Sequence, residues 1–315
     1  MQIVQAPRAS AILYNLLKSQ PNPRPWLLPA NICPIVPITF FKAEVSFEFV
    51  DISAEALHMD LEQATERLKR GGYGGLLYAH TYGELSTPED FFQQVKALYP
   101  DLLLIDDRCL CTPDLDPWQE MSADVALYST GYAKMVDLNF GGYAFSKEGT
   151  PYQLEHLPFN PEAHEKIESG YKQAIQNRET YTYVDNAWLQ TDADLPAWYD
   201  YRQQIESGLE TSLKHRAVLN NYYVDYLPVE IQLPQEYQNW RFNIRVKNKS
   251  KVLEAIFAED LFASSHYTSL AGIMAQSQCP QAEKLAGEII NLFNDHHFTA
   301  QQAERVCAVI MENLN

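Results

Sequence analysis

The chain has 315 residues, of which 46% are hydrophobic and 12% aromatic, so it can bury a full core and is long enough for two domains. Lysine and arginine number 24 against 41 aspartates and glutamates, which gives a formal net charge of −17. This excess of negative charge repels phosphate backbones and anionic lipid headgroups, and it argues against nucleic-acid or membrane-surface binding.

The cysteines and the N-terminus bear on cellular location. Five cysteines, an odd number without metal-type spacing, indicate reduced thiols. The chain does not open with a signal-peptide pattern, and no apolar run approaches the ~20 residues needed to cross a bilayer. We therefore expect a cytoplasmic protein.

The N-terminal half alternates between helical patterns and short, continuously apolar runs. Residues 8–18 have the periodicity of an amphipathic helix, and Ser10 near its first turn either helps bind an anion or simply caps the helix. Strands are expected at 26–34, 45–52, 75–79 and 102–105, and helices at 53–70 and 88–98. This alternation predicts a mostly parallel sheet that is covered by helices on both faces.

An apolar strand at residues 125–128, a polar loop and a second strand follow within residues 124–145. The loop carries Lys134, whose amine can lose its proton more easily in a partly desolvated cleft and condense with a carbonyl. His80, Asp107 and Ser129 also come just after predicted strands, where parallel sheets place their sites. Individually, each has an ordinary interpretation as a surface, loop, capping or turn residue. Together they suit pyridoxal phosphate, which needs a lysine, a carboxylate for its pyridine nitrogen and a hydroxyl for its phosphate.

The C-terminal half mainly predicts architecture. A long helix expected at residues 195–223 links a large domain, residues 1–195, to a small domain, residues 196–315. His296 and His297 are adjacent on a loop with no third ligand nearby in the sequence, which favours surface histidines over a metal site. Helices are expected at 158–178, 195–223, 251–259, 282–293 and from a capping box at 299–302 to about 314, with a strand at 240–246 and a loop at 181–193.

Several local motifs have a spacing that matches a known family. Lys134 follows Ser129 by five positions and precedes a glycine pair at 141 and 142. Further matches are Pro29-Ala30, His80-Thr81-Tyr82-Gly83 and Asp106-Asp107. With these motifs the sequence resembles the DegT/DnrJ/EryC1/StrS aminotransferases, pyridoxal-phosphate enzymes of fold type I that mostly transaminate keto-sugars attached to nucleotides.

The resemblance implies an α/β fold of the fold type I PLP-transferase kind, with a mostly parallel sheet flanked by helices and a smaller α+β C-terminal domain. It implies that Lys134 holds pyridoxal phosphate as an internal aldimine and acts as a general base, while Asp107 keeps the pyridine nitrogen cationic. Ser129 would bind the phosphate and His80 would orient the ring or substrate. Ser10 is the hydroxyl nearest to the family's phosphate-binding position, and Cys33 stands where an aromatic ring often stacks on the cofactor. The expected reaction moves an amino group from a small-molecule donor to a keto acceptor, such as a sugar or sugar nucleotide, in a homodimer.

A second hypothesis is a degenerate family member that acts as a binding or regulatory subunit. Pro7-Arg8-Ala9 replaces the family's glycine and threonine before the first helix, and its asparagine–arginine motif is not recognisable beyond residue 170. Retention of Lys134 and Asp107 in register opposes this hypothesis. A dehydratase is a third alternative, but such members usually have histidine in place of the lysine.

Overall fold

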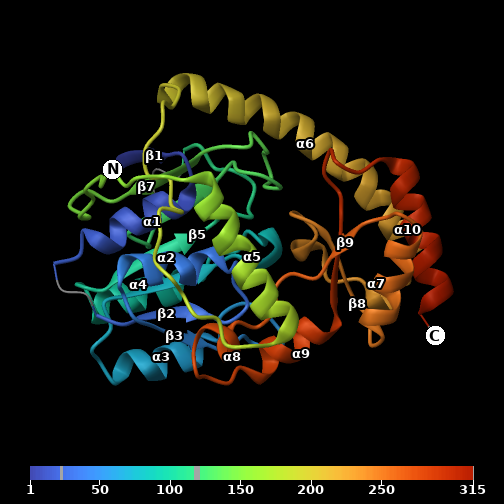
Figure 1. Cartoon of the computed structure of the whole chain (residues 1–315), viewed down its shortest axis with the longest axis horizontal. Coiled ribbons are helices and arrows are strands. Elements are labelled where there is room, and N and C mark those ends of the chain that lie inside the picture. The colour runs from blue at the N-terminus through green and yellow to red at the C-terminus, as the bar shows by residue number, and fades with distance from the viewer. Residues whose placement is uncertain (22–23, 117–120, 315) are drawn as a thin grey trace.

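The computed structural model describes residues 1–21, 24–116 and 121–314, and a seven-stranded sheet organises the larger part of them (Figure 1). The strand order is β1-β7-β6-β5-β4-β2-β3. Strands β2 to β6 run parallel, whereas β7 is antiparallel to both β6 and β1. The strands are β1 (Gln2–Ala6), β2 (Trp26–Pro29), β3 (Phe47–Val50), β4 (Gly75–Ala79), β5 (Leu103–Asp107), β6 (Val125–Ser129) and β7 (Gly142–Ser146).

Helices cover both faces of this sheet, as the sequence predicts. Leu77 and Ile105 belong to one buried cluster with residues of α1 (Ala9–Lys18) and α2 (Ile35–Ala43). Their neighbours Leu76 and Leu104 belong to another, with residues of α3 (Leu61–Lys69) and α4 (Glu89–Leu98). Successive strand residues point to opposite faces, so a strand buried on both sides has to be apolar throughout.

A smaller antiparallel sheet lies towards the C-terminus. Its strand order is β8 (Phe242–Arg245), β10 (Ile289–Leu292) and β9 (Ala263–Ser264). The C-terminal end of α6 (Trp198–Tyr226), α7 (Lys249–Ala258) and α10 (Ala300–Asn313) pack on it. The short helices α8 (Ala271–Met274) and α9 (Pro280–Glu288) instead join the buried cluster of the large sheet. The domain division near residue 195 stays a prediction, since segments beyond it contribute to both clusters.

Some expected elements differ from the structure. The strand expected at 26–34 ends at Pro29, and the helix expected from residue 53 begins only at Leu61, where the Asp60 carboxylate accepts hydrogen bonds from the amides of Glu62 and Gln63. The helix expected at 282–293 ends at Glu288. Its last apolar residues form β10, because pairing with β8 and β9 satisfies their backbone on both sides.

Helix α6, 29 residues long, connects the two sheets (Figure 1). Near its start Tyr201 and Ile205 pack with β6 and β7, and near its end Leu219 and Tyr223 pack with the small sheet. Ser212 Oγ in its middle donates a hydrogen bond of 2.6 Å to the carbonyl of Met135.

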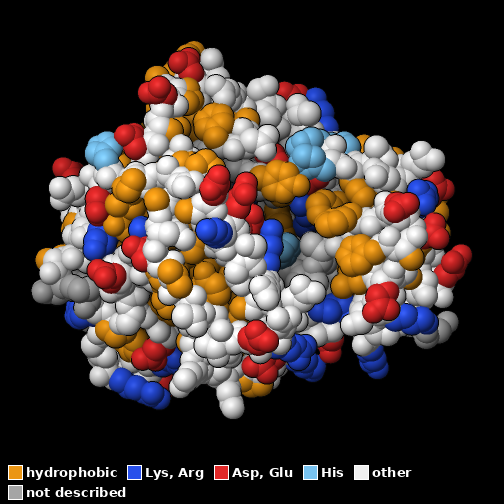
Figure 2. Space-filling model, viewed as in Figure 1, with side chains coloured by type: hydrophobic (Ala, Val, Ile, Leu, Met, Phe, Trp, Pro, Cys, Tyr) orange, Lys and Arg blue, Asp and Glu red, His pale blue; other side chains and the backbone are white. Residues whose placement is uncertain are grey.

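Charged side chains of both signs are spread over the face seen in Figure 2. The five cysteines are free thiols, and the capping box of Thr299 and Gln302 opens α10. Among the described helices, none is long and apolar enough to cross a membrane.

Candidate active site

A cavity of about 500 Å³ lies at the carboxyl ends of β5 and β6. Asp107 is the last residue of β5, Ser129 is the last residue of β6, and Lys134 follows in the loop before β7. All three line the cavity, together with Ser10 and Cys33. Five of the six candidate residues therefore share one cavity.

Asp107 is a buried carboxylate that faces this cavity. Its side chain is fixed by a hydrogen bond of 3.0 Å from the backbone amide of Cys109 to Oδ1. Burial raises the pKa of Asp107, because a carboxylate loses solvation in the protein interior, while the Cys109 amide and the Lys134 ammonium favour the ionised form. A cationic group bound opposite Asp107 would therefore be stabilised strongly.

Two glycines bring the Lys134 loop against the start of α1. Gly141 has a φ of +93°, and a Cβ there would lie 2.2 Å from the Tyr201 hydroxyl oxygen. A Cβ on Gly142 would lie 2.4 Å from the backbone nitrogen of Ala9. The amide of Gly141 also donates to the carbonyl of Pro7 over 2.7 Å. The glycine pair thus permits a close approach that any side chain would block.

The start of α1 forms one end of the cavity. Its N-cap is Arg8, which makes no side-chain capping hydrogen bond. Ser10 is therefore not the N-cap residue, which was one of the two roles expected for it from the sequence. Arg8, Ser10 and Ser129 all line the cavity. A helix N-terminus, an arginine and two hydroxyls are groups that can bind an anion together.

Helix α5 (Pro161–Asn177) covers the cavity, and the sequence analysis did not connect it with the site. His164, Glu168 and Tyr171 line the cavity from one face of this helix. Their spacing of four and three residues could have indicated from the sequence that they share one face of a helix. It could not have indicated that this face covers the cavity. His164 Nε2 lies 3.2 Å from an Arg8 guanidinium nitrogen, a contact that links α5 to the start of α1.

His80 does not line the cavity. Its Nε2 lies 2.7 Å from Asp106 Oδ1, and its Nδ1 lies 2.8 Å from the carbonyl of Glu84. His80 is 1% exposed, so it belongs to a buried polar network behind β5.

No protein-family profile and no curated protein matches the sequence, whereas many solved structures match the fold. A DegT DnrJ EryC1 StrS aminotransferase from Brucella abortus is 14% identical, with a TM-score of 0.68 over 100% of this chain and 86% of its own. PseC from Helicobacter pylori, an aminotransferase of pseudoaminic acid biosynthesis, is 11% identical, with a TM-score of 0.69 over 100% and 87%. The E. coli GDP-4-keto-6-deoxy-D-mannose-3-dehydratase, solved with hydrated PLP bound, is 12% identical, with a TM-score of 0.64 over 98% and 87%. These matches confirm the predicted α/β fold, which this chain shares with solved fold type I enzymes.

Proposed function

We propose that this chain is a pyridoxal-phosphate-dependent aminotransferase. The observation that carries the proposal is that Lys134 and the buried Asp107 line one cavity, at the sheet edge where fold type I places its cofactor. Shared fold alone is weaker support, because one fold hosts many functions.

The residues present fit this cofactor. The cavity volume is within the ordinary range for small-molecule sites. Asp107, whose pKa is raised by burial, gains a favourable partner in a protonated pyridine nitrogen. The start of α1, Ser10, Ser129 and Arg8 would hold the phosphate. Arg8 stands within the segment that replaces the family's usual phosphate-binding residues, so it offers a positive charge from this chain itself.

Pyridoxal phosphate, when bound, supplies an aldehyde that bonds to amines and a ring that takes up electrons from a substrate carbon. Lys134 would hold the cofactor covalently and, once released, would take the proton from the substrate's α-carbon as general base. Asp107 would keep the ring nitrogen protonated. His164, Glu168 and Tyr171 on α5 would limit access of water from above.

The proposed reaction moves an amino group from a small-molecule donor to a keto acceptor, for which a sugar or sugar nucleotide is our candidate. We also propose a cytoplasmic homodimer, the arrangement that the family resemblance implies. The subunit number can be measured by size-exclusion chromatography with light scattering, where a monomer at micromolar concentration would contradict it.

The test is an absorption spectrum after addition of pyridoxal phosphate and removal of the excess. The wild type should retain a visible band that Lys134→Ala lacks, and an amino donor such as glutamate should collapse the band. Because Lys134 is half-buried and its side chain is not part of the core, the variant should melt at nearly the wild-type temperature. Absence of the band in folded wild type at saturating cofactor would refute the proposal and favour a binding or regulatory subunit.

A further inference from the structure

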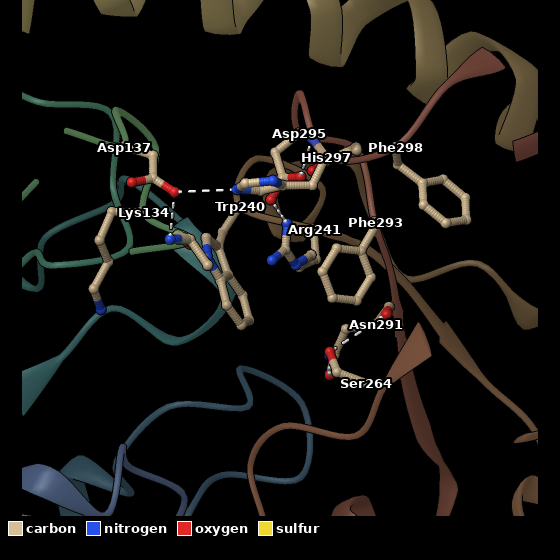
Figure 3. A network of polar contacts seen from close by, with 12 residues as sticks. Lys134, Asp137, Trp240, Arg241, Ser264, Asn291, Phe293, Asp295, His297 and Phe298 are labelled. Carbon is tan, nitrogen blue, oxygen red and sulfur yellow. Dashed lines mark hydrogen bonds and ion pairs between the residues drawn. The ribbon is translucent and has the colours of Figure 1, made fainter. Parts of the chain in front are cut away.

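Two loops, one next to the large sheet and one next to the small sheet, bring together three side chains of types that bind metals. None of the three lines the cavity. Asp137 lies in the loop between β6 and β7, and His296 and His297 lie between β10 and α10. One ligand atom of each lies within 4.8 Å of the other two. The sequence analysis treated the histidines as surface residues, since Asp137 is about 160 positions away. Figure 3 shows Asp137 facing His297, with Lys134 on the same loop.

The spacing suits coordination of one metal ion. Two ligand atoms that are each bound about 2.1 Å from a tetrahedral metal lie about 3.4 Å apart. His297 Nε2 and Asp137 Oδ2 are 3.4 Å apart. The His296 ring centroid lies 3.9 Å from that of His297, and His296 is exposed, so rotation of its side chain can complete the set.

Asp137 is already held in place for this role. Its side chain is 4% exposed, and its two oxygens accept hydrogen bonds from the backbone amides of Ala133 and Asn139, at 2.8 and 3.0 Å. The amide of His297 in turn donates to Asp295 Oδ1 over 3.1 Å. Such outer contacts orient ligands before a metal arrives and increase affinity.

The neighbouring arginines are engaged elsewhere and do not occupy this carboxylate. Arg216 donates to the carbonyls of Trp240 and Lys134, and Arg241 pairs with Asp295. The net charge of the chain, −17, also favours the approach of cations.

We propose that Asp137, His296 and His297 form a binding site for a divalent transition-metal ion of the zinc class. Two imidazoles and a carboxylate are ligands that zinc accepts, and three protein ligands leave a fourth position open. A bound ion would join the Lys134 loop to the loop that follows the small sheet. None of the three residues lines the cavity, so metal binding can be tested whether or not the protein binds pyridoxal phosphate.

The experiment titrates the full-length protein, freed of metal by a chelator, with Co²⁺ and then with Zn²⁺. Tetrahedral Co²⁺ gives a visible d–d absorption, which reports coordination directly. The test variants are His296→Gln and His297→Gln, which leave intact the hydrogen bonds that the amides of Ala133 and Asn139 donate to Asp137. The matched control is His156→Gln, because His156 pairs with Asp192 at 2.8 Å on the surface without belonging to the three-ligand group.

We expect wild type and His156→Gln to bind one Co²⁺ per chain, to release it to Zn²⁺ and to melt at a higher temperature with zinc. Loss of an outer contact at a metal site costs 10–100-fold in affinity, so loss of a ligand in His297→Gln should cost at least about 100-fold. The site would be refuted if the wild type gave no tetrahedral Co²⁺ spectrum, or if both test variants bound as tightly as the control. The second result would show that the metal binds elsewhere on the chain.

Discussion

Two neighbouring carboxylates on β5 have opposite surroundings. Asp106 points to a closed network in which His80 contacts it at 2.7 Å, and the adjacent Glu84 carboxylate lies 3.1 Å from His58 Nε2. Asp107 points to the other side and lines the cavity, fixed by the amide of Cys109. One step along a strand thus separates a polar group that is satisfied within the protein from one that is available to a ligand.

Asp106 and Asp107 contribute to the protein in different ways. Hydrogen-bonded partners compensate the desolvation of Asp106, so its network stabilises the fold. Burial raises the pKa of Asp107, which means that its ionised form lowers the stability of the folded protein. A buried carboxylate kept at such a cost is the type of residue found at functional sites.

Removal of the Asp107 charge should have its strongest consequence in catalysis. Asp107→Asn should lower the transamination rate at least about 100-fold, because a neutral amide cannot stabilise a cationic ring nitrogen. Single-turnover kinetics with glutamate would measure it. Asp106→Asn is the matched control, and equal rate losses in the two variants would mean that Asp107 has no special role.

Replacement of Asp106 should have a smaller effect, on the stability of the protein. Asp106→Asn should destabilise the protein by about 1.5–3 kcal/mol, because a charge-assisted hydrogen bond with the buried His80 is lost. Urea unfolding followed by circular dichroism would give the free energy of unfolding. Unchanged stability would show that the network is not structural.

The smallest expected effect is a gain in stability. Without cofactor at pH 7.5, Asp107→Asn should have a higher free energy of unfolding than the wild type. This gain should be smaller than the loss expected for Asp106→Asn. The pKa of Asp107 is raised in the folded state, so the wild type loses stability as the pH rises through that pKa. The advantage of Asp107→Asn should accordingly shrink as the pH falls towards the unfolded value of about 3.9. Urea unfolding between about pH 4 and pH 8 measures this difference, and a difference that does not change with pH over that range would contradict the assignment.

Much of the large sheet was predictable, because the sequence there is locally consistent. Continuous apolar runs gave β4 with its observed bounds and β6 within one residue. Strand β1 was missed, since it is short and half polar and is defined by pairing with β7. Helix α2 was missed because it is apolar almost all round and so has no polar face to reveal its period.

Site residues could be predicted from the sequence only where their position next to a strand determines where they lie. Asp107, Ser129 and Lys134 follow strands whose ends meet at one edge, so strand assignment places them together. His80 also follows a strand, but its side chain joins the Asp106 network. The α5 residues over the cavity, and Asp137 beside His297, come together through contacts distant in sequence, which no local pattern encodes.

Helix α6 adds a mechanical consequence. As a rod of 29 residues it is about 43 Å long, so tilting it by about 10° would carry one end through roughly 7 Å. Midway along it, Ser212 and Arg216 hold the carbonyls of Met135 and Lys134. A rotation of the small sheet relative to the large one would therefore move the backbone of Lys134 as well. The position of the Lys134 amine thus depends on the orientation of α6.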